Sequence, residues 1–262
     1  MKKEIKIFYT KDWPSSSAGK ADYELLDTGE GEKLERFGPY TFIRPYKDAV
    51  WPKCQTPSVG QMWMKADGKF WSSKSGGKGG LATLKQRGNG WKMSKTVFDT
   101  KWEMGYKGIK FFAFPTPFRH LGFFPEQASH WDFIEEKISK ATQKTVFGET
   151  SPKTVFKPKF LNLFGYTGVA SLFALRAGAE VTHLDASKQS LDFTKDNQKL
   201  NAELAEAPMR VIEDDALKFL EREEKRGNKY DGIIMDPPKF GRGPKGEVWK
   251  IEEMLSKLLS SV

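Results

Sequence analysis

The sequence predicts an α/β chain in which a parallel sheet, with helices on both faces, follows a small β-rich domain. Two observations lead to this prediction. From residue 160 onward, strand-like apolar runs alternate with helix-like runs, which is typical of a parallel sheet. The first 120 residues instead carry short β-like runs between glycine- and proline-rich turns. With 262 residues and 38% hydrophobic content, the chain is long enough to bury a core.

The front part is interpreted as β-rich because of its strand-like runs and turn signals. The runs are YTFIRP (40–45), GKFWSS (68–73) and KFFAF (110–114), and the turns include SGGKGG and RGNG. A helix is predicted next, because Pro125 suits a first helical position and apolar residues then recur every three or four positions: Trp131, Ile134, Ile138 and Ala141. We therefore divide the chain into a β-rich domain (1–120), a helix and polar linker (121–158) and a second domain (159–262).

The second domain is predicted to contain four strands and the helices between them. The strands are KFLNLF (159–164), AEVTHLD (179–185), MRVIED (209–214) and YDGIIMD (230–236). The intervening helices are predicted over 168–178, 187–201 and 216–227, with Ser187 as an N-cap and Gly178 and Gly227 as terminators. In such sheets, ligands bind beyond the carboxyl ends of the strands, so the residues that end each strand are the candidate site.

Those strand ends carry glycines and acids. Gly165 and Gly168 follow the first strand, where they allow a tight turn into a helix amino terminus. Asp185 ends the second strand, 20 residues after Gly165, where a carboxylate can bind a ribose diol. Asp215 follows the third strand and can accept the amino group of an adenine, and Asp236 ends the fourth.

Each feature also has an ordinary interpretation: a strand-turn-helix corner, a solvated turn aspartate, or, for Glu213 and Asp214, surface or helix-cap acids. Together they predict a nucleoside pocket. A dinucleotide site is the alternative, but its phosphates require a fuller glycine cradle. S-adenosylmethionine has no phosphate, so a looser turn suffices.

The motifs LNLFGYTG, LDAS, DDA and DPPKF resemble the successive motifs of class I S-adenosylmethionine-dependent methyltransferases. HLGFFPEQASHWDF and DPPKFGRG further resemble the branch of large-subunit ribosomal RNA methyltransferases that act on cytosine C5 or guanine. The resemblance covers roughly residues 119 to 262, with GEGEKLERFGPY as companion sequence in the front domain. It implies a Rossmann-like class I methyltransferase sheet and S-adenosyl-L-methionine as cofactor.

The resemblance also implies roles for individual residues. The cofactor-binding set is Asn162, Phe164, Gly165, Thr167, Gly168, Asp185, Asp215, Ala216 and Asp236, and the catalytic set is Asp236, Pro237, Pro238, Lys239 and Phe240. Prolines have no N–H and fixed φ angles, so we expect the Asp-Pro-Pro carbonyls to form a rigid arc that accepts hydrogen bonds from a base. Phe240 would stack on that base, and Lys239 would meet phosphates. The alternative is that Pro-Pro merely ends a strand and Phe240 is a core residue.

Enzymes of this branch that methylate cytosine C5 use a cysteine carboxyl-terminal to the Asp-Pro-Pro motif. This sequence has no cysteine after Cys54, which also excludes an intrachain disulfide. A class I sheet has seven strands, and four are visible here, so we expect a sequence truncated at its carboxyl terminus. The missing segment could carry the cysteine. The alternative is that a smaller sheet suffices.

The net charge of +9 lies in the first half, since residues 1–130 hold 22 basic and 13 acidic side chains, whereas residues 131–262 hold 21 of each. Residues 65–119 hold 12 basic and 3 acidic side chains among ten aromatic ones, a composition that suits single-stranded RNA. The alternative is that the aromatic side chains form a core and the lysines solvate a surface.

No long apolar run or secretory signal is present, so we expect a cytoplasmic protein that does not enter a membrane. Three scattered histidines have no metal-ligand spacing, so no metal is expected.

The sequence therefore favours a methyltransferase acting on a base in RNA, with ribosomal RNA preferred. Two alternatives stay open: a methyltransferase acting on protein or a small molecule, and a non-catalytic RNA-binding factor with a vestigial fold. The oligomeric state is open.

Overall fold

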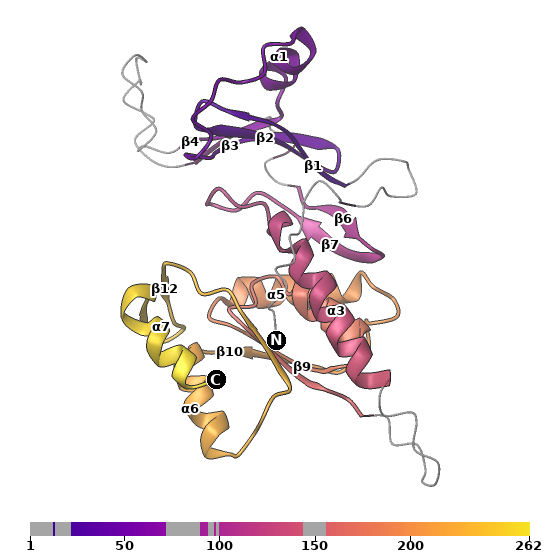
Figure 1. Cartoon of the computed structure of the whole chain (residues 1–262), viewed down its shortest axis with the longest axis vertical. Helices are drawn as coiled ribbons and strands as arrows, with labels where there is room; N and C mark the ends of the chain where they lie inside the picture. The colour runs from indigo at the N-terminus through magenta and orange to yellow at the C-terminus, as the bar shows by residue number, and fades with distance from the viewer. Residues whose placement is uncertain (1–12, 14–21, 72–89, 94–96, 98–99, 144–155) are drawn as a thin grey trace, which may run out of the picture. The chain divides into compact units, whose positions relative to one another are not determined.

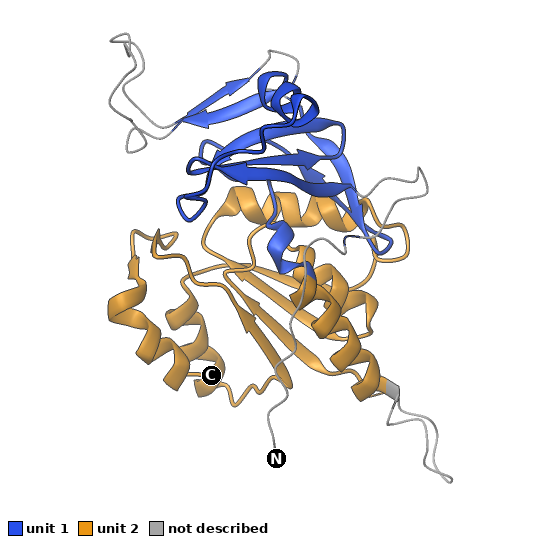
Figure 2. Cartoon of the chain, turned by 45° about the horizontal axis from the view of Figure 1, so that its top comes forward, with its two compact units in different colours: residues 1–128 blue, residues 129–262 orange. Residues whose placement is uncertain are grey.

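The computed structural model describes residues 13, 22–71, 90–93, 97, 100–143 and 156–262. The chain divides into two compact units, residues 1–128 and 129–262, which Figure 2 colours separately. The turn SGGKGG and most of the predicted linker lie outside the described residues.

The first unit contains a five-stranded sheet in the order β1-β2-β3-β4-β5. Strands β1 (Tyr23–Gly29), β2 (Glu32–Phe37) and β3 (Tyr40–Pro45) form an antiparallel meander. Helix α1 (Pro57–Met64) leads to β4 (Gly68–Trp71), which is parallel to β3, and β5 (Gly90–Met93) is antiparallel to β4. A separate hairpin follows, made of β6 (Trp102–Tyr106) and β7 (Ile109–Ala113). The β-rich character predicted for this part is confirmed.

Aromatic side chains form much of the core of this unit. Phe70, Tyr106 and Phe111, which belong to the basic and aromatic segment 65–119, are at most 7% exposed. Base stacking is therefore excluded for these three, and the core interpretation is correct for them. Trp71 and Phe118 differ, because they are 46% and 70% exposed.

The second unit contains the predicted parallel sheet. The polypeptide enters through a short 3-10 helix (Pro125–Gln127) and α3 (Ala128–Gln143), which confirms Pro125 as a first helical residue. The alternating elements are β8 (Lys159–Leu163), α4 (Val169–Arg176), β9 (Glu180–Asp185), α5 (Lys188–Lys199), β10 (Met209–Glu213), α6 (Ala216–Lys225) and β11 (Gly232–Met235). The four strands are parallel, in the order β10-β9-β8-β11, as their colours in Figure 1 help to follow.

Alternation along β8 determines which helices cover each face. Leu161 and Leu163 share a buried cluster with Phe219 of α6 and Leu258 of α7 (Ile251–Ser260). Asn162 lies between them, so its side chain points to the other face, where its amide contacts α4. Helices on both faces are thereby confirmed.

The segment after β11 forms a hairpin that the sequence did not reveal. Strands β12 (Phe240–Arg242) and β13 (Val248–Lys250) pair antiparallel, and α7 follows at once. Among the helices in the described part of the chain, none is long and apolar enough to cross a membrane.

Candidate functional site

The carboxyl ends of the four parallel strands lie along one edge of the sheet. The register places Leu163 of β8 beside Leu184 of β9 and Met235 of β11, and Glu213 of β10 beside Asp185. The chain runs outward from β8 through β9 to β10 and then returns to the opposite side of β8 with β11. The topological switch point therefore lies between β8 and β11, where sheets of this kind bind ligands.

The turn after β8, residues 164–168, has an unusual backbone. Phe164, Tyr166 and Gly168 have φ values of 56°, 52° and 83°, and the first two are uncommon for residues with a side chain. A Cβ on Gly168 would lie 2.5 Å from Thr194 Cγ2, and one on Gly165 would overlap the ring of His183. Both glycines are therefore required by close packing beneath the turn.

Side chains of the second strand and of α5 hold this turn in place. The hydroxyl of Thr194 donates to the carbonyl oxygen of Tyr166 (3.0 Å), and the amide of Asn197 donates to that of Thr167 (2.8 Å). The backbone N–H of Tyr166 donates to Asp185 Oδ2 (2.8 Å). The carbonyl oxygens of Tyr166 and Thr167 thus point towards α5. Helix α4 begins immediately after the turn, and the backbone N–H groups of a first helical turn have no partners within the helix.

A buried polar chain supports the turn from within the sheet. Asn162 Nδ2 lies 3.0 Å from Ser171 Oγ, which lies 2.9 Å from His183 Nδ1, and His183 Nε2 lies 3.2 Å from Thr194 Oγ1. The Thr194 hydroxyl donates its proton to the carbonyl oxygen of Tyr166, so it can only accept from His183. We therefore assign the proton of the His183 ring to Nε2, and the Ser171 hydroxyl then donates to Nδ1. Burial lowers the pKa of His183 to about 4, which fits a neutral ring.

Sequence reasoning missed this polar chain, because it considered His183 as a metal ligand and found no ligand spacing. The polar chain also changes the role of Asn162: its side chain is 4% exposed and bonded to Ser171, so it supports the turn from beneath. The sequence contains a weak signal, since Asn162 in the first strand and Thr182 and His183 in the second are polar residues at positions where a core residue is expected.

Asp185 lies at the end of β9, beside the turn. Its Oδ1 accepts a hydrogen bond from the backbone N–H of Ser187 (2.8 Å), and its Oδ2 accepts the one from Tyr166. Burial raises the pKa of Asp185, although these N–H donors oppose the rise. The backbone N–H of Ala186 is a third donor to this carboxylate, so about one of its roughly four acceptor positions remains for a ligand hydroxyl.

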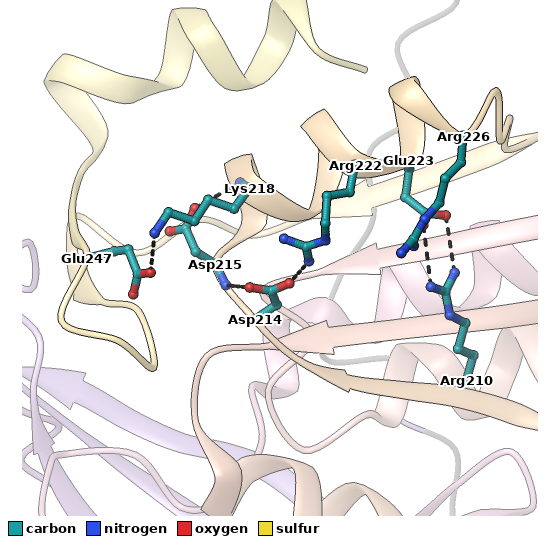
Figure 3. A network of polar contacts seen from close by, with 8 residues as sticks. All are labelled: Arg210, Asp214, Asp215, Lys218, Arg222, Glu223, Arg226 and Glu247. Carbon is teal, nitrogen blue, oxygen red and sulfur yellow. Dashed lines mark hydrogen bonds and ion pairs between the residues drawn. The ribbon is translucent and has the colours of Figure 1, made fainter.

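The acids after β10 form caps and ion pairs (Figure 3). Asp215 is the N-cap of α6, with Oδ1 accepting from the N–H of Lys218 (3.1 Å). Asp214 accepts from the N–H of Asp215 and pairs with Arg222. The helix-cap interpretation considered for Asp214 thus applies to Asp215, while the buried Ala216 opens the helix.

The same helix is tied to the β12–β13 hairpin. Lys218 Nζ lies 2.6 Å from Glu247 Oε1, and this hydrogen bond, with nearby backbone N–H groups, lowers the pKa of Glu247 to about 2 (Figure 3). The hairpin follows directly from the Asp-Pro-Pro-Lys-Phe segment, so the contact links the third and fourth strand ends.

The Asp-Pro-Pro-Lys segment is clamped from the carboxyl-terminal side. The indole N–H of Trp249 donates to the carbonyl oxygen of Pro238 (2.6 Å), and the N–H of Ile251 donates to that of Lys239 (3.1 Å). Trp249 thus occupies one of the two acceptor positions of the Pro238 carbonyl oxygen, which was expected to accept from a base. Trp249 also packs on Phe164 of the turn, with ring centroids 5.0 Å apart. One buried side chain thus contacts both the first and the fourth strand ends.

Asp236 and Pro237 follow β11 at the switch point. Phe240 is 56% exposed, which excludes the alternative that it is a core residue. The Lys239 side chain is 85% exposed and lies 3.5 Å from Glu252. The fold therefore gathers Phe164 to Gly168, Asp185, Asp214 to Ala216 and Asp236 to Phe240 along one edge. Cys54 is an exposed residue of the other unit, and no group of metal-binding side chains occurs among the residues that the structure describes.

Comparison with known proteins gives three relevant similarities. The family described as conserved hypothetical protein 95 matches residues 138–259. The ribosomal RNA large subunit methyltransferase I of Aeromonas salmonicida is 40% identical over 83 residues, which cover 31% of this chain and 21% of that protein. The matched part thus spans about a fifth of the length of such curated relatives.

Solved structures match over more of the chain. A SAM-dependent methyltransferase from Agrobacterium tumefaciens is 40% identical, with a TM-score of 0.75 over 92% of this chain and 67% of that one. A candidate SAM-dependent methyltransferase from Streptococcus mutans is 16% identical, with a TM-score of 0.62 over 92% of this chain and 57% of that one, and therefore shares the fold.

Proposed function

Because this chain belongs to the S-adenosylmethionine-dependent methyltransferases, we propose that it binds S-adenosylmethionine along the edge just described and methylates a base in RNA, with ribosomal RNA as the favoured substrate. The observation that carries the proposal is the convergence of the glycine turn, Asp185 and the Asp-Pro-Pro-Lys-Phe segment at one switch point.

The residues present fit this cofactor. The turn has no Cβ at Gly165 or Gly168, and it leads into the amino terminus of α4, a combination that suits the carboxylate of the methionine part. Asp185 binds a ribose hydroxyl with the acceptor position left by its three backbone donors. We assign the adenine to Asp215 and its neighbour Ala216 at the start of α6.

When bound, the cofactor supplies an electrophilic methyl group on a sulfonium, so the protein's task is alignment and exclusion of water. Asp236 and the carbonyl oxygen of Pro237 position the N–H groups of the target base. Phe240 stacks on its exposed face, and Lys239 contacts a neighbouring phosphate.

Three observations support RNA as the substrate class. The Aeromonas salmonicida relative is named for ribosomal RNA, the net charge of +9 favours a polyanion, and exposed Phe240 follows the Asp-Pro-Pro motif. Residues 65–119 of the first unit contact the phosphate backbone of the RNA. A cytoplasmic location is consistent with this substrate.

The test uses the 262-residue chain with S-adenosylmethionine labelled in its methyl group and separate pools of unmodified ribosomal RNA, transfer RNA and protein. Digestion and mass analysis identify the labelled nucleoside or amino acid. We expect label in ribosomal RNA from the wild type and none from Asp236→Ala. Label in protein alone, or in nothing, would contradict the proposal.

A further inference from the structure

A cavity lies at the opposite edge of the same sheet, where the parallel strands begin. It has a volume of about 630 Å³, and its walls come from β8, β9, β10 and the loop between α6 and β11. Its lining residues are Lys157, Lys159, Glu180, Val181, Thr182, Pro208, Met209, Arg210, Glu223, Asn228, Lys229 and Tyr230. The cavity is therefore separate from the methyl-transfer site, which lies at the carboxyl ends of these strands.

Four of the lining side chains are basic and two are acidic, but the two acids are not equivalent. Glu223 is 2% exposed and accepts hydrogen bonds from Tyr230 Oη (2.6 Å) and Asn228 Nδ2 (2.9 Å). Arg210 and Arg226 also donate to it, at 3.2 Å and 3.0 Å (Figure 3). These donors hold the pKa of Glu223 at about 2, so its charge is fully compensated inside the wall.

The remaining basic groups have no such compensation. Within the described residues, no hydrogen bond or ion pair engages the ammonium groups of Lys157, Lys159 or Lys229. Some other lysines of the unit are instead paired with acids, as Lys218 is with Glu247 (2.6 Å) and Lys257 with Glu221 (2.9 Å). Three exposed cations against one uncompensated carboxylate, Glu180, make the cavity electropositive.

We infer that this cavity is a binding site for the phosphate backbone of the RNA substrate. The inference rests on the proposed function. Lysines contact phosphates as mobile point charges and need no fixed geometry, which suits three side chains on strand starts and loops. The RNA thus binds at two edges of the sheet: the carboxyl ends of the strands, where the base is methylated, and the amino ends, where lysines contact its phosphates.

The test compares two triple variants of the 262-residue chain with equal loss of charge. The cavity variant is K157Q/K159Q/K229Q. The matched control, K140Q/K195Q/K199Q, removes three exposed lysines from α3 and α5. Affinity for a single-stranded ribosomal RNA fragment is measured between 0.05 and 0.3 M salt, with melting temperature and S-adenosylhomocysteine affinity as checks on folding.

For single strands, each phosphate contact adds about 0.7 to the slope of log affinity against log salt concentration. One contact therefore raises the affinity at 0.1 M salt about fivefold relative to that at 1 M salt. We therefore expect the cavity variant to bind RNA about 10- to 100-fold more weakly, with a slope smaller by about 2. The control should stay within about twofold of the wild type, and S-adenosylhomocysteine affinity should not change in either variant.

Equal losses in the two variants, with methylation of RNA by the wild type intact, would overturn the cavity assignment alone. A wild type that neither binds nor methylates RNA would overturn both this inference and the proposed function.

Discussion

Replacing Trp249 by phenylalanine tests how the fourth strand end is held. Trp249 is 3% exposed, donates to Pro238 over 2.6 Å and packs on Phe164. Loss of the hydrogen bond costs about 1 to 2 kcal/mol, because the carbonyl loses a buried donor. Loss of one ring from a buried site adds about 1 to 2 kcal/mol. For a unit of this size the sum lowers the melting temperature by about 8 to 16 °C.

The functional effect separates positioning from stability. Displacement of the Asp-Pro-Pro arc by a fraction of an ångström should lower kcat about 10- to 100-fold. Affinity for S-adenosylhomocysteine should change less than about threefold, since the turn after β8 keeps its contacts with α5. The assay is methyl transfer to RNA with separate kcat and KM, alongside titration calorimetry.

Trp131→Phe is the matched control. Trp131 is 1% exposed and stacks on Phe173 of α4, with centroids 5.5 Å apart, so it loses the same ring from a buried site away from the Asp-Pro-Pro segment. We expect a stability loss with little change in kcat. The positioning role of Trp249 would be refuted if both variants lowered kcat equally.

Two further changes test the turn and the far cavity wall. Gly168→Ala should weaken cofactor binding at least tenfold in a calorimetric titration, since its φ is 83° and the new Cβ would lie 2.5 Å from Thr194 Cγ2. Gly60→Ala is the control: the space around its Cβ is open, so the same titration should show no effect. Glu223→Gln should lower the free energy of unfolding by about 2 kcal/mol, because Arg210 loses its charged partner. The pKa of Glu223 is lowered from 4.5 to about 2, so the stability it contributes is present above about pH 4.5 and is lost as the pH falls towards 2. The melting temperatures of the wild type and Glu223→Gln should therefore converge between pH 4.5 and pH 2. A difference that stays constant over this range would contradict the account.

Sequence reasoning was sufficient for the parallel sheet because its signals are local. Alternating apolar runs with Ser187, Gly178 and Gly227 at helix ends predicted the four strands and three helices to within a few residues. Asp185 was assigned to the site because parallel strands must end at a common edge. The position of Phe240, exposed after the Asp-Pro-Pro motif, agrees with the functional interpretation.

The parts that failed depend on contacts between distant residues. The bond from Trp249 to Pro238 requires the register of the β12–β13 hairpin, which was not predicted although its turn contains Gly243, Pro244 and Gly246. The polar chain through His183 requires β8, β9, α4 and α5 to be packed together first. The core location of Phe111 shows why aromatic residues in a basic segment do not identify stacking surfaces.

The most direct test of the account is calorimetric titration of S-adenosylhomocysteine into the 262-residue chain and its Asp185→Ala variant. The wild type should bind one equivalent, and the variant should bind at least about 10-fold more weakly, because a hydrogen bond to a charged acceptor contributes about 1.5 to 3 kcal/mol. Equal affinity in the two proteins, at equal melting temperature, would contradict the assignment of Asp185 to the ribose. No binding by the folded wild type would contradict the cofactor site at the carboxyl ends of β8 to β11.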